Sequence, residues 1–205
     1  DAEMIRDYAL AASALLSAKI GGPSVRPYQP PKVWEAVAMP ESDTRYYKQD
    51  HGESLYRRSM YTFWKRAAPP ASMDILNAPS REVCTVRRER TDTPLQALVT
   101  LNDTQFVEAA RVLAEHALEA SPDDDKRIDF IASRLLARPF RADETATVIS
   151  SLAQLQGFYK SHADDAKKLI AVGESPVDSK LDPPTLAAWT MLTNELMNLD
   201  EVLNK

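Results

Sequence analysis

The stretch TPLQALVTLNDTQFVEAARVLAEHALEA, residues 93–120, decides the fold class. Thr93 precedes Gln96 by three residues, which is a capping box, and Pro94 occupies the first helical position. A second cap is predicted within residues 102–105, and after it apolar residues recur at spacings of three and four. The stretch therefore predicts two consecutive α-helices. The apolar stripe of the second consists of Phe106, Ala110, Leu113 and Ala117.

Amphipathic helices are also predicted towards the C-terminus. Residues 124–137 and 142–162 repeat apolar positions at helical spacing, and Pro183 opens a further helix. Short connections separate these helices, so we expect antiparallel packing. The stripe of the last helix consists of Trp189, Leu192, Leu196, Leu199 and Leu203.

The N-terminal side is more irregular. Helical spacing over residues 2–20 predicts a helix that Gly21 and Gly22 end. A second helix is predicted at residues 54–67, whereas residues 22–52 and 67–92 are expected to be long irregular segments. Period-2 alternation is weak throughout, with residues 82–86 the best strand candidate. We predict an all-α fold, an irregular multi-helix bundle with long proline- and aromatic-rich loops.

The length of 205 residues suits a single helical domain. A subdivision into a loop-rich part, residues 1–92, and a helical part, residues 93–205, is an alternative. Because the sequence begins directly in a helical pattern with Asp1, we expect a piece of a longer protein.

Charge and hydropathy exclude some partners. The formal net charge is −5, and residues 119–205 carry all of it. Residues 45–90 are locally basic, with ten Lys and Arg against five Asp and Glu. A mildly acidic chain with one basic stretch is not typical of a nucleic-acid-binding protein, so no nucleic-acid partner is expected. No apolar run approaches the ~20 residues that span a bilayer, so no membrane span is predicted in this fragment.

Motifs for cofactor chemistry are missing from the sequence. Cys84 is the single cysteine, and its neighbours Val83 and Val86 predict a small buried apolar residue. There is no Cys-x-x-Cys-His haem motif, no phosphate-binding glycine loop and no zinc pattern around the three histidines. We therefore expect no cofactor, no metal and no catalytic residue in this fragment.

Arginine among aromatic residues is the remaining signal. Eight of the 15 aromatic residues lie between Tyr28 and Trp64, and residues 81–90 add four arginines. The planar guanidinium suits carboxylate, phosphate or sulfate, and it stacks on aromatic rings. In the structural alternative, these side chains bond to backbone carbonyls and pin the irregular chain. The candidate binding residues are Arg57, Arg58, Trp64, Lys65, Arg66, Arg87, Arg88 and Arg90.

Three segments in order resemble a known family. They are GGPSV (21–25) with PYQP (27–30), LYRRSMYTFWKR (55–66), and CTVRRERTDTPLQAL (84–98) followed by LND (101–103). Together they resemble the planctomycete-specific C-terminal domain of unknown function, with Asp92 departing from an expected Asn. The resemblance implies a large exported protein, periplasmic or at the cell surface, that often also carries planctomycete cytochrome c-type domains. Any haem would then lie in those other domains.

Three functions stay open at this point. The first is a binding or interaction module, with neighbouring domains of the parent protein or an anionic glycan as partners, because Trp, Tyr and Arg are enriched at interfaces. The second is an enzyme domain that acts on anionic polysaccharide. The third is a purely structural cap.

Overall fold

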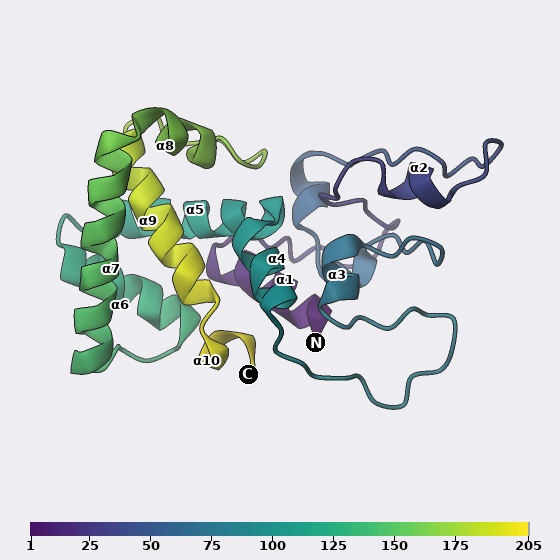
Figure 1. Ribbon diagram of the computed structural model, residues 1–205, viewed down its shortest axis with the longest axis horizontal. Coiled ribbons are helices and arrows are strands. Elements are labelled where there is room, and N and C mark those ends of the chain that lie inside the picture. Colours follow the sequence, from purple (N-terminus) through teal and green to yellow (C-terminus); the bar gives the residue numbers. More distant parts are fainter. Residues whose placement is uncertain (205) are drawn as a thin grey trace. The chain divides into compact units, whose positions relative to one another are not determined.

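A computed structural model describes residues 1–204 (Figure 1). These residues form α-helices, two short 3-10 helices and isolated β-bridges, and contain no β-strand, which confirms the predicted all-α fold. None of the helices described is long and apolar enough to cross a membrane. The α-helices are α1 (Ala2–Ala12), α2 (Val33–Val37), α3 (Ala71–Ile75), α4 (Pro94–Asn102), α5 (Thr104–Ala120), α6 (Asp124–Leu135), α7 (Ala142–Ser161), α8 (Ala163–Ile170), α9 (Pro183–Met197) and α10 (Asp200–Leu203), and the 3-10 helices are η1 (Gly52–Tyr56) and η2 (Ser59–Tyr61).

The chain divides into two compact units, which are described separately. Unit 1 comprises Asp1–Tyr8 and Leu16–Val99, and unit 2 comprises Ala9–Leu15 and the residues from Thr100 onward. Helices α1 and α4 each contribute residues to both units. Whether the chain folds as one domain or two stays a prediction.

Helix α1 ends earlier than its sequence pattern predicts. It stops at Ala12, whereas the pattern extends to residue 20. Ser13 donates its hydroxyl to the Ala9 and Leu10 carbonyls, and Ala14 adopts the left-handed region with φ of 60°. The Leu15 amide then donates to the Leu10 carbonyl at 2.9 Å, as in a Schellman-type end. A non-glycine residue therefore ends this helix before the glycine pair is reached.

Trp34 anchors the proline-rich segment of unit 1. Its side chain is buried, with the Tyr47 ring 4.8 Å away edge-on and the Phe63 ring 5.6 Å away. The Tyr47 hydroxyl donates to the Pro27 carbonyl at 2.5 Å, and burial raises the pKa of this phenol. The irregular segment is thus wrapped on its own aromatic cluster.

The helix predicted over residues 54–67 is wrong. This segment forms η1, η2 and extended chain, because its backbone bonds go to distant partners. The Ser17 amide donates to the Tyr56 carbonyl, and Val25 exchanges hydrogen bonds with Tyr61 and Phe63. A segment whose donors and acceptors are used by other parts of the chain cannot also make i→i−4 bonds.

The capping box that opens α4 is confirmed. The Gln96 amide donates to the Thr93 hydroxyl at 3.3 Å, and the Thr93 amide donates to the Gln96 side-chain oxygen at 3.0 Å. The side-chain amide of Gln96 also donates a hydrogen bond to the Ile75 carbonyl at the end of α3. The cap therefore ties α4 to the second irregular segment of unit 1.

Unit 2 is a packed helical bundle centred on α5 and α9. Helix α9 packs against α5, α7 and α8, and α6 packs against α5, as the ribbon shows (Figure 1). The predicted helices at 124–137 and 142–162 are found as α6 and α7, but α8 was not predicted; its segment ADDAKKLI is only eight residues long. Fully buried side chains on these helices include Leu113, Ile128, Ile131, Leu186, Trp189 and Leu192.

One buried charged cluster fastens a loop in unit 2. Glu108 is fully buried and accepts the Ser175 amide at 2.6 Å. Arg111, also fully buried, donates to the Ser175 carbonyl and to Glu115, each at 2.7 Å. Gly173 has φ of 92°, and a Cβ there would lie 2.3 Å from the Glu108 carboxyl carbon. The loop between α8 and α9 therefore requires glycine at residue 173.

Candidate functional site

Arg57 lies in the interior of unit 1 rather than at a ligand surface. Its guanidinium donates to the Gly21 carbonyl at 2.5 Å and to the Pro23 carbonyl at 3.1 Å, and it stacks 3.9 Å from the centre of the Tyr61 ring. The residue is only 4% exposed. These contacts match the structural alternative, in which an arginine satisfies the carbonyls of irregular chain.

Arg6 completes this arrangement, although sequence reasoning missed it. Its guanidinium donates to the Leu55 carbonyl at 2.7 Å and to the Arg57 carbonyl at 2.9 Å. Asp7, the next residue of α1, accepts the Ser59 amide at 2.7 Å. The sequence carried a signal, because Arg6 falls on the same helical face as the buried Ala2 and Leu10.

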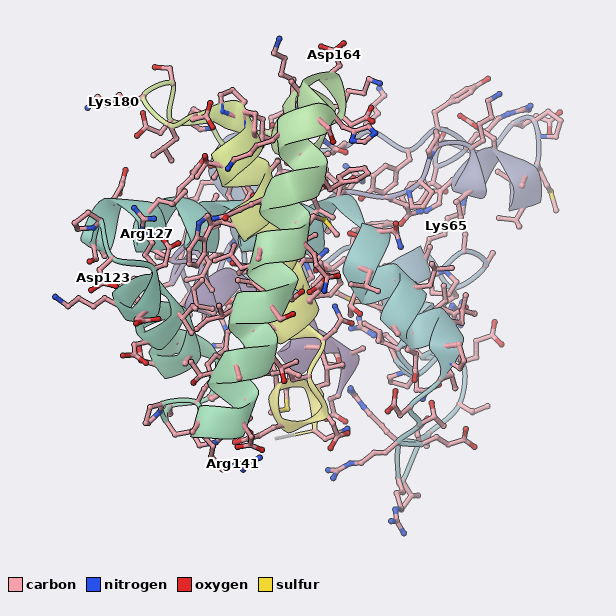
Figure 2. The ribbon with its side chains drawn as sticks, turned by 60° about the vertical axis from the view of Figure 1, so that its left-hand side comes forward. Lys65, Asp123, Arg127, Arg141, Asp164 and Lys180 are labelled. Carbon is pink, nitrogen blue, oxygen red and sulfur yellow. The ribbon has the colours of Figure 1, made fainter. Side chains whose placement is uncertain are left out.

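Trp64 and Lys65 are half-buried and also make contacts within unit 1. The Trp64 indole donates to the Ser80 carbonyl at 3.1 Å, and the Arg81 guanidinium lies 4.5 Å from the Trp64 ring centre. Lys65 donates to the Thr44 carbonyl at 2.8 Å and lies over Trp34. The Lys65 side chain is labelled in Figure 2. Trp64 is thus the predicted residue that links the two basic segments.

Arg58 and Arg66 are exposed on unit 1. Arg58 Nε lies 4.0 Å from an Asp7 carboxylate oxygen, at the limit of an ion pair. An exposed pair at this distance contributes little to stability. Both side chains are accessible to a ligand.

Arg88 is held on α1. It donates to Glu3 at 2.5 Å and lies 3.8 Å from the Asp1 carboxylate. Partial burial opposes ionisation of Glu3, but the hydrogen bond and charge of Arg88 prevail and lower the pKa of this carboxyl below its ordinary value. Arg88 therefore fixes one end of its segment to α1.

Residues 82–87 form a loop held at both ends, which we call the anchored loop. The Arg81–Trp64 stack fixes its start and the Arg88–Glu3 pair fixes its end. Between these anchors all six side chains are exposed, with Val83 at 73% and Val86 fully so. Figure 1 shows the chain between α3 and α4 as a long segment without helix.

Cys84 lies on the anchored loop and is exposed, so the prediction of a buried cysteine is wrong. The predicted strand at residues 82–86 is also wrong, because this segment has no β-bridge. Apolar neighbours indicate burial only where the segment packs against the fold, and Val83 and Val86 do not. The loop is supported by its two ends instead.

Arg87 and Arg90 have neither an ion pair nor a hydrogen bond with any residue from 1 to 204. Both are exposed. The eight candidate residues therefore separate into buried, half-buried and exposed sets. Arg57 stabilises the fold, and Trp64 and Arg88 contribute to holding the two ends of the anchored loop. The exposed arginines are accessible to a ligand.

Metal binding finds no support in the described part of the chain. Among residues 1–204, no group of three or more His, Cys, Asp or Glu side chains could hold a metal ion. The expected absence of a cofactor in this fragment stays a prediction.

Comparison with known proteins gives one match. The model of a family described as PSD1, Protein of unknown function (DUF1553), matches residues 1–152. The matched region contains all of unit 1 and continues into α7. No curated protein and no solved structure matches the chain.

Proposed function

The chain belongs to the PSD1 family of proteins of unknown function, and we propose that it is an interaction module that binds an anionic partner through the anchored loop and Arg90. The observation that supports this proposal is the exposure of Val83, Val86 and Arg87 between two fixed ends. Arginine is enriched at protein interfaces, and apolar side chains gathered beside polar ones on a surface are typical of interaction sites. The neighbouring domains of a larger exported protein and an anionic glycan are the candidate partners.

The chemistry of the loop favours binding over support of the fold. An arginine that stabilises the fold donates to backbone carbonyls, as Arg57 does, whereas Arg87 and Arg90 are exposed to solvent. Because both ends of the loop are fixed, ordering the loop on binding costs less conformational entropy. In this proposal the exposed arginines provide the affinity, and the two anchors restrict the conformation of the loop.

Binding to an immobilised sulfated glycan tests this function. The double change Arg87→Ala, Arg90→Ala should weaken binding roughly tenfold, since each exposed ion pair contributes up to about 1 kcal/mol. Binding should also weaken as salt concentration rises. The matched control is Arg58→Ala, Arg66→Ala, which removes two exposed arginines of unit 1 outside the loop. Equal losses in the two variants, or no binding by the native chain, would count against the proposal.

A further inference from the structure

Unit 2 contains a pocket of about 590 Å³. It lies between α7, α9 and α10, close to the turn that precedes α7. Figure 2 labels Arg141 at the start of α7 and Asp164 beyond its other end. The pocket residues of α7 run from Asp143 to Ser151, which is about 12 Å along a helix.

The floor of the pocket is apolar. Val148, Leu192 and Leu196 are nearly buried, and Leu199 is 38% exposed at its edge. Covering such a floor with aliphatic side chains is favourable, because apolar surface is removed from water. The occupant should therefore present aliphatic groups.

The rim of the pocket is acidic. Arg138 is its single base, and it is already bonded to Glu144 and Glu201, at 2.9 Å and 2.5 Å. Arg141, outside the lining, pairs with Glu144 as well and lies 3.7 Å from the Asp143 carboxylate. Asp143, Glu195 and Asp200 remain exposed around the opening, so the occupant should also carry positive charge. The acidic lining residues are Asp143, Glu144, Glu195, Asp200 and Glu201.

The chain itself displays a segment with this combination of groups. Residues 83–90 carry the exposed Val83 and Val86, followed by the exposed Arg87 and Arg90. Val83 and Val86 are three residues apart and so at most about 10 Å apart, which is within the length of the pocket along α7. Val83 and Val86 match the apolar floor of the pocket. Arg87 and Arg90 match the carboxylates of its rim.

From this complementarity we infer that residues 83–90 of one copy bind the acidic pocket of a second copy. The inference rests on the proposed function, because it names the acidic surface that the anchored loop binds. Each copy carries both surfaces, so a pair of copies offers two loops to two pockets. The pairing is charge-dependent and weakens as salt rises.

Light scattering after size-exclusion chromatography, over a range of protein concentrations, tests the inference. The native chain should dimerise at low salt. Two variants should each stay monomeric: a loop variant, Arg87→Glu with Arg90→Glu, and a pocket variant, Asp143→Lys with Glu195→Lys. An equimolar mixture of the two variants should dimerise again, because every loop then faces a pocket of opposite charge.

Two control variants keep the result specific. Arg58→Glu with Arg66→Glu reverses two exposed arginines outside the loop, and Asp129→Lys with Asp164→Lys reverses two exposed acids outside the pocket. Both should dimerise within about threefold of the native association constant, as surface changes outside an interface do. Far-ultraviolet circular dichroism checks that each variant is folded.

Three results would overturn the inference. They are a native chain that stays monomeric at low salt, loop and pocket variants that dimerise as the native chain does, and a mixture that stays monomeric. The proposed function has its own separate readout. If the native chain is monomeric yet its sulfated-glycan binding depends on Arg87 and Arg90, the self-association fails and the interaction module stands.

Discussion

The two units of this chain are stabilised by different means. In unit 1, the buried guanidinium groups of Arg6 and Arg57 donate to backbone carbonyls of chain that has little helix. In unit 2, amphipathic helices bury apolar stripes against one another, with Leu113 and Trp189 fully enclosed. The difference shows that an irregular segment can be ordered by a few long-range donors, whereas a bundle depends on many apolar contacts.

The largest effect is expected from Arg57→Ala. The change removes the hydrogen bonds that the charged Arg57 side chain donates to the carbonyls of Gly21 and Pro23, at about 1.5–3 kcal/mol each. We expect unit 1 to lose about 4 kcal/mol in the free energy of unfolding. Denaturant titration followed by tryptophan fluorescence measures the loss. Arg58→Ala is the adjacent control and should change stability by less than about 0.5 kcal/mol; equal effects at the two positions would refute the structural role of Arg57.

Leu113→Ala is the matching change in unit 2. Leu113 is fully buried on α5, so the substitution removes apolar contacts and leaves a cavity. A loss of about 3 kcal/mol is expected, within the usual range for buried leucine. Leu199→Ala provides the control within unit 2, because Leu199 is 38% exposed. If both leucines cost the same, unit 2 does not depend on its buried stripes.

A smaller effect is expected from Arg88→Ala, which removes one anchor of the loop. The Arg88 and Glu3 side chains are 32% and 20% exposed, so the pair contributes about 0.5–1 kcal/mol. The pKa of Glu3 is lowered in the folded state, so this contribution is present above its ordinary pKa of 4.5 and is lost as pH falls through the lowered value. Thermal unfolding at pH 7 and in acid measures it. A difference between native and variant chains that grows in acid would contradict this assignment.

The smallest expected effect is on the surface of unit 2. Arg138 hydrogen-bonds Glu144 and, with the Arg141 backbone amide, lowers the pKa of that carboxyl to about 2. The stabilisation is present above the ordinary value of 4.5 and is lost as pH falls towards 2. We expect Arg138→Gln to raise the pKa of Glu144, as followed by nuclear magnetic resonance of its carboxyl carbon. Glu201→Gln removes the other partner of Arg138 and should leave the pKa of Glu144 low; the opposite ranking of the two variants would show that Arg138 is not the cause.

The sequence predicted unit 2 better than unit 1 for a physical reason. Helices α5, α7 and α9 of unit 2 show their stripes in local spacing. The segment at residues 54–67 also shows helical spacing, but its conformation depends on Arg6, about fifty residues away. A local sequence pattern does not show a hydrogen-bond donor that comes from a distant part of the chain.

The same reason limits what could be read of the candidate site. Arg57 and Arg58 are neighbours in sequence, yet one is buried against carbonyls and the other is exposed. Composition identified the arginine-rich segments but could not separate their members, and Val83 and Val86 wrongly indicated that Cys84 is buried. Only the three-dimensional contacts distinguish anchors from available side chains.

Hydrogen–deuterium exchange of native, Arg57→Ala and Leu113→Ala chains tests the central claim most directly, because it reports each unit separately. Arg57→Ala should increase exchange at Ser17, Val25 and Phe63, whose amides bond to distant carbonyls in unit 1, and should leave α5 and α9 protected. Leu113→Ala should increase exchange in α5 and α9 and leave those three amides protected. Loss of protection in both units from either change, or no loss at Val25 in Arg57→Ala, would contradict the account.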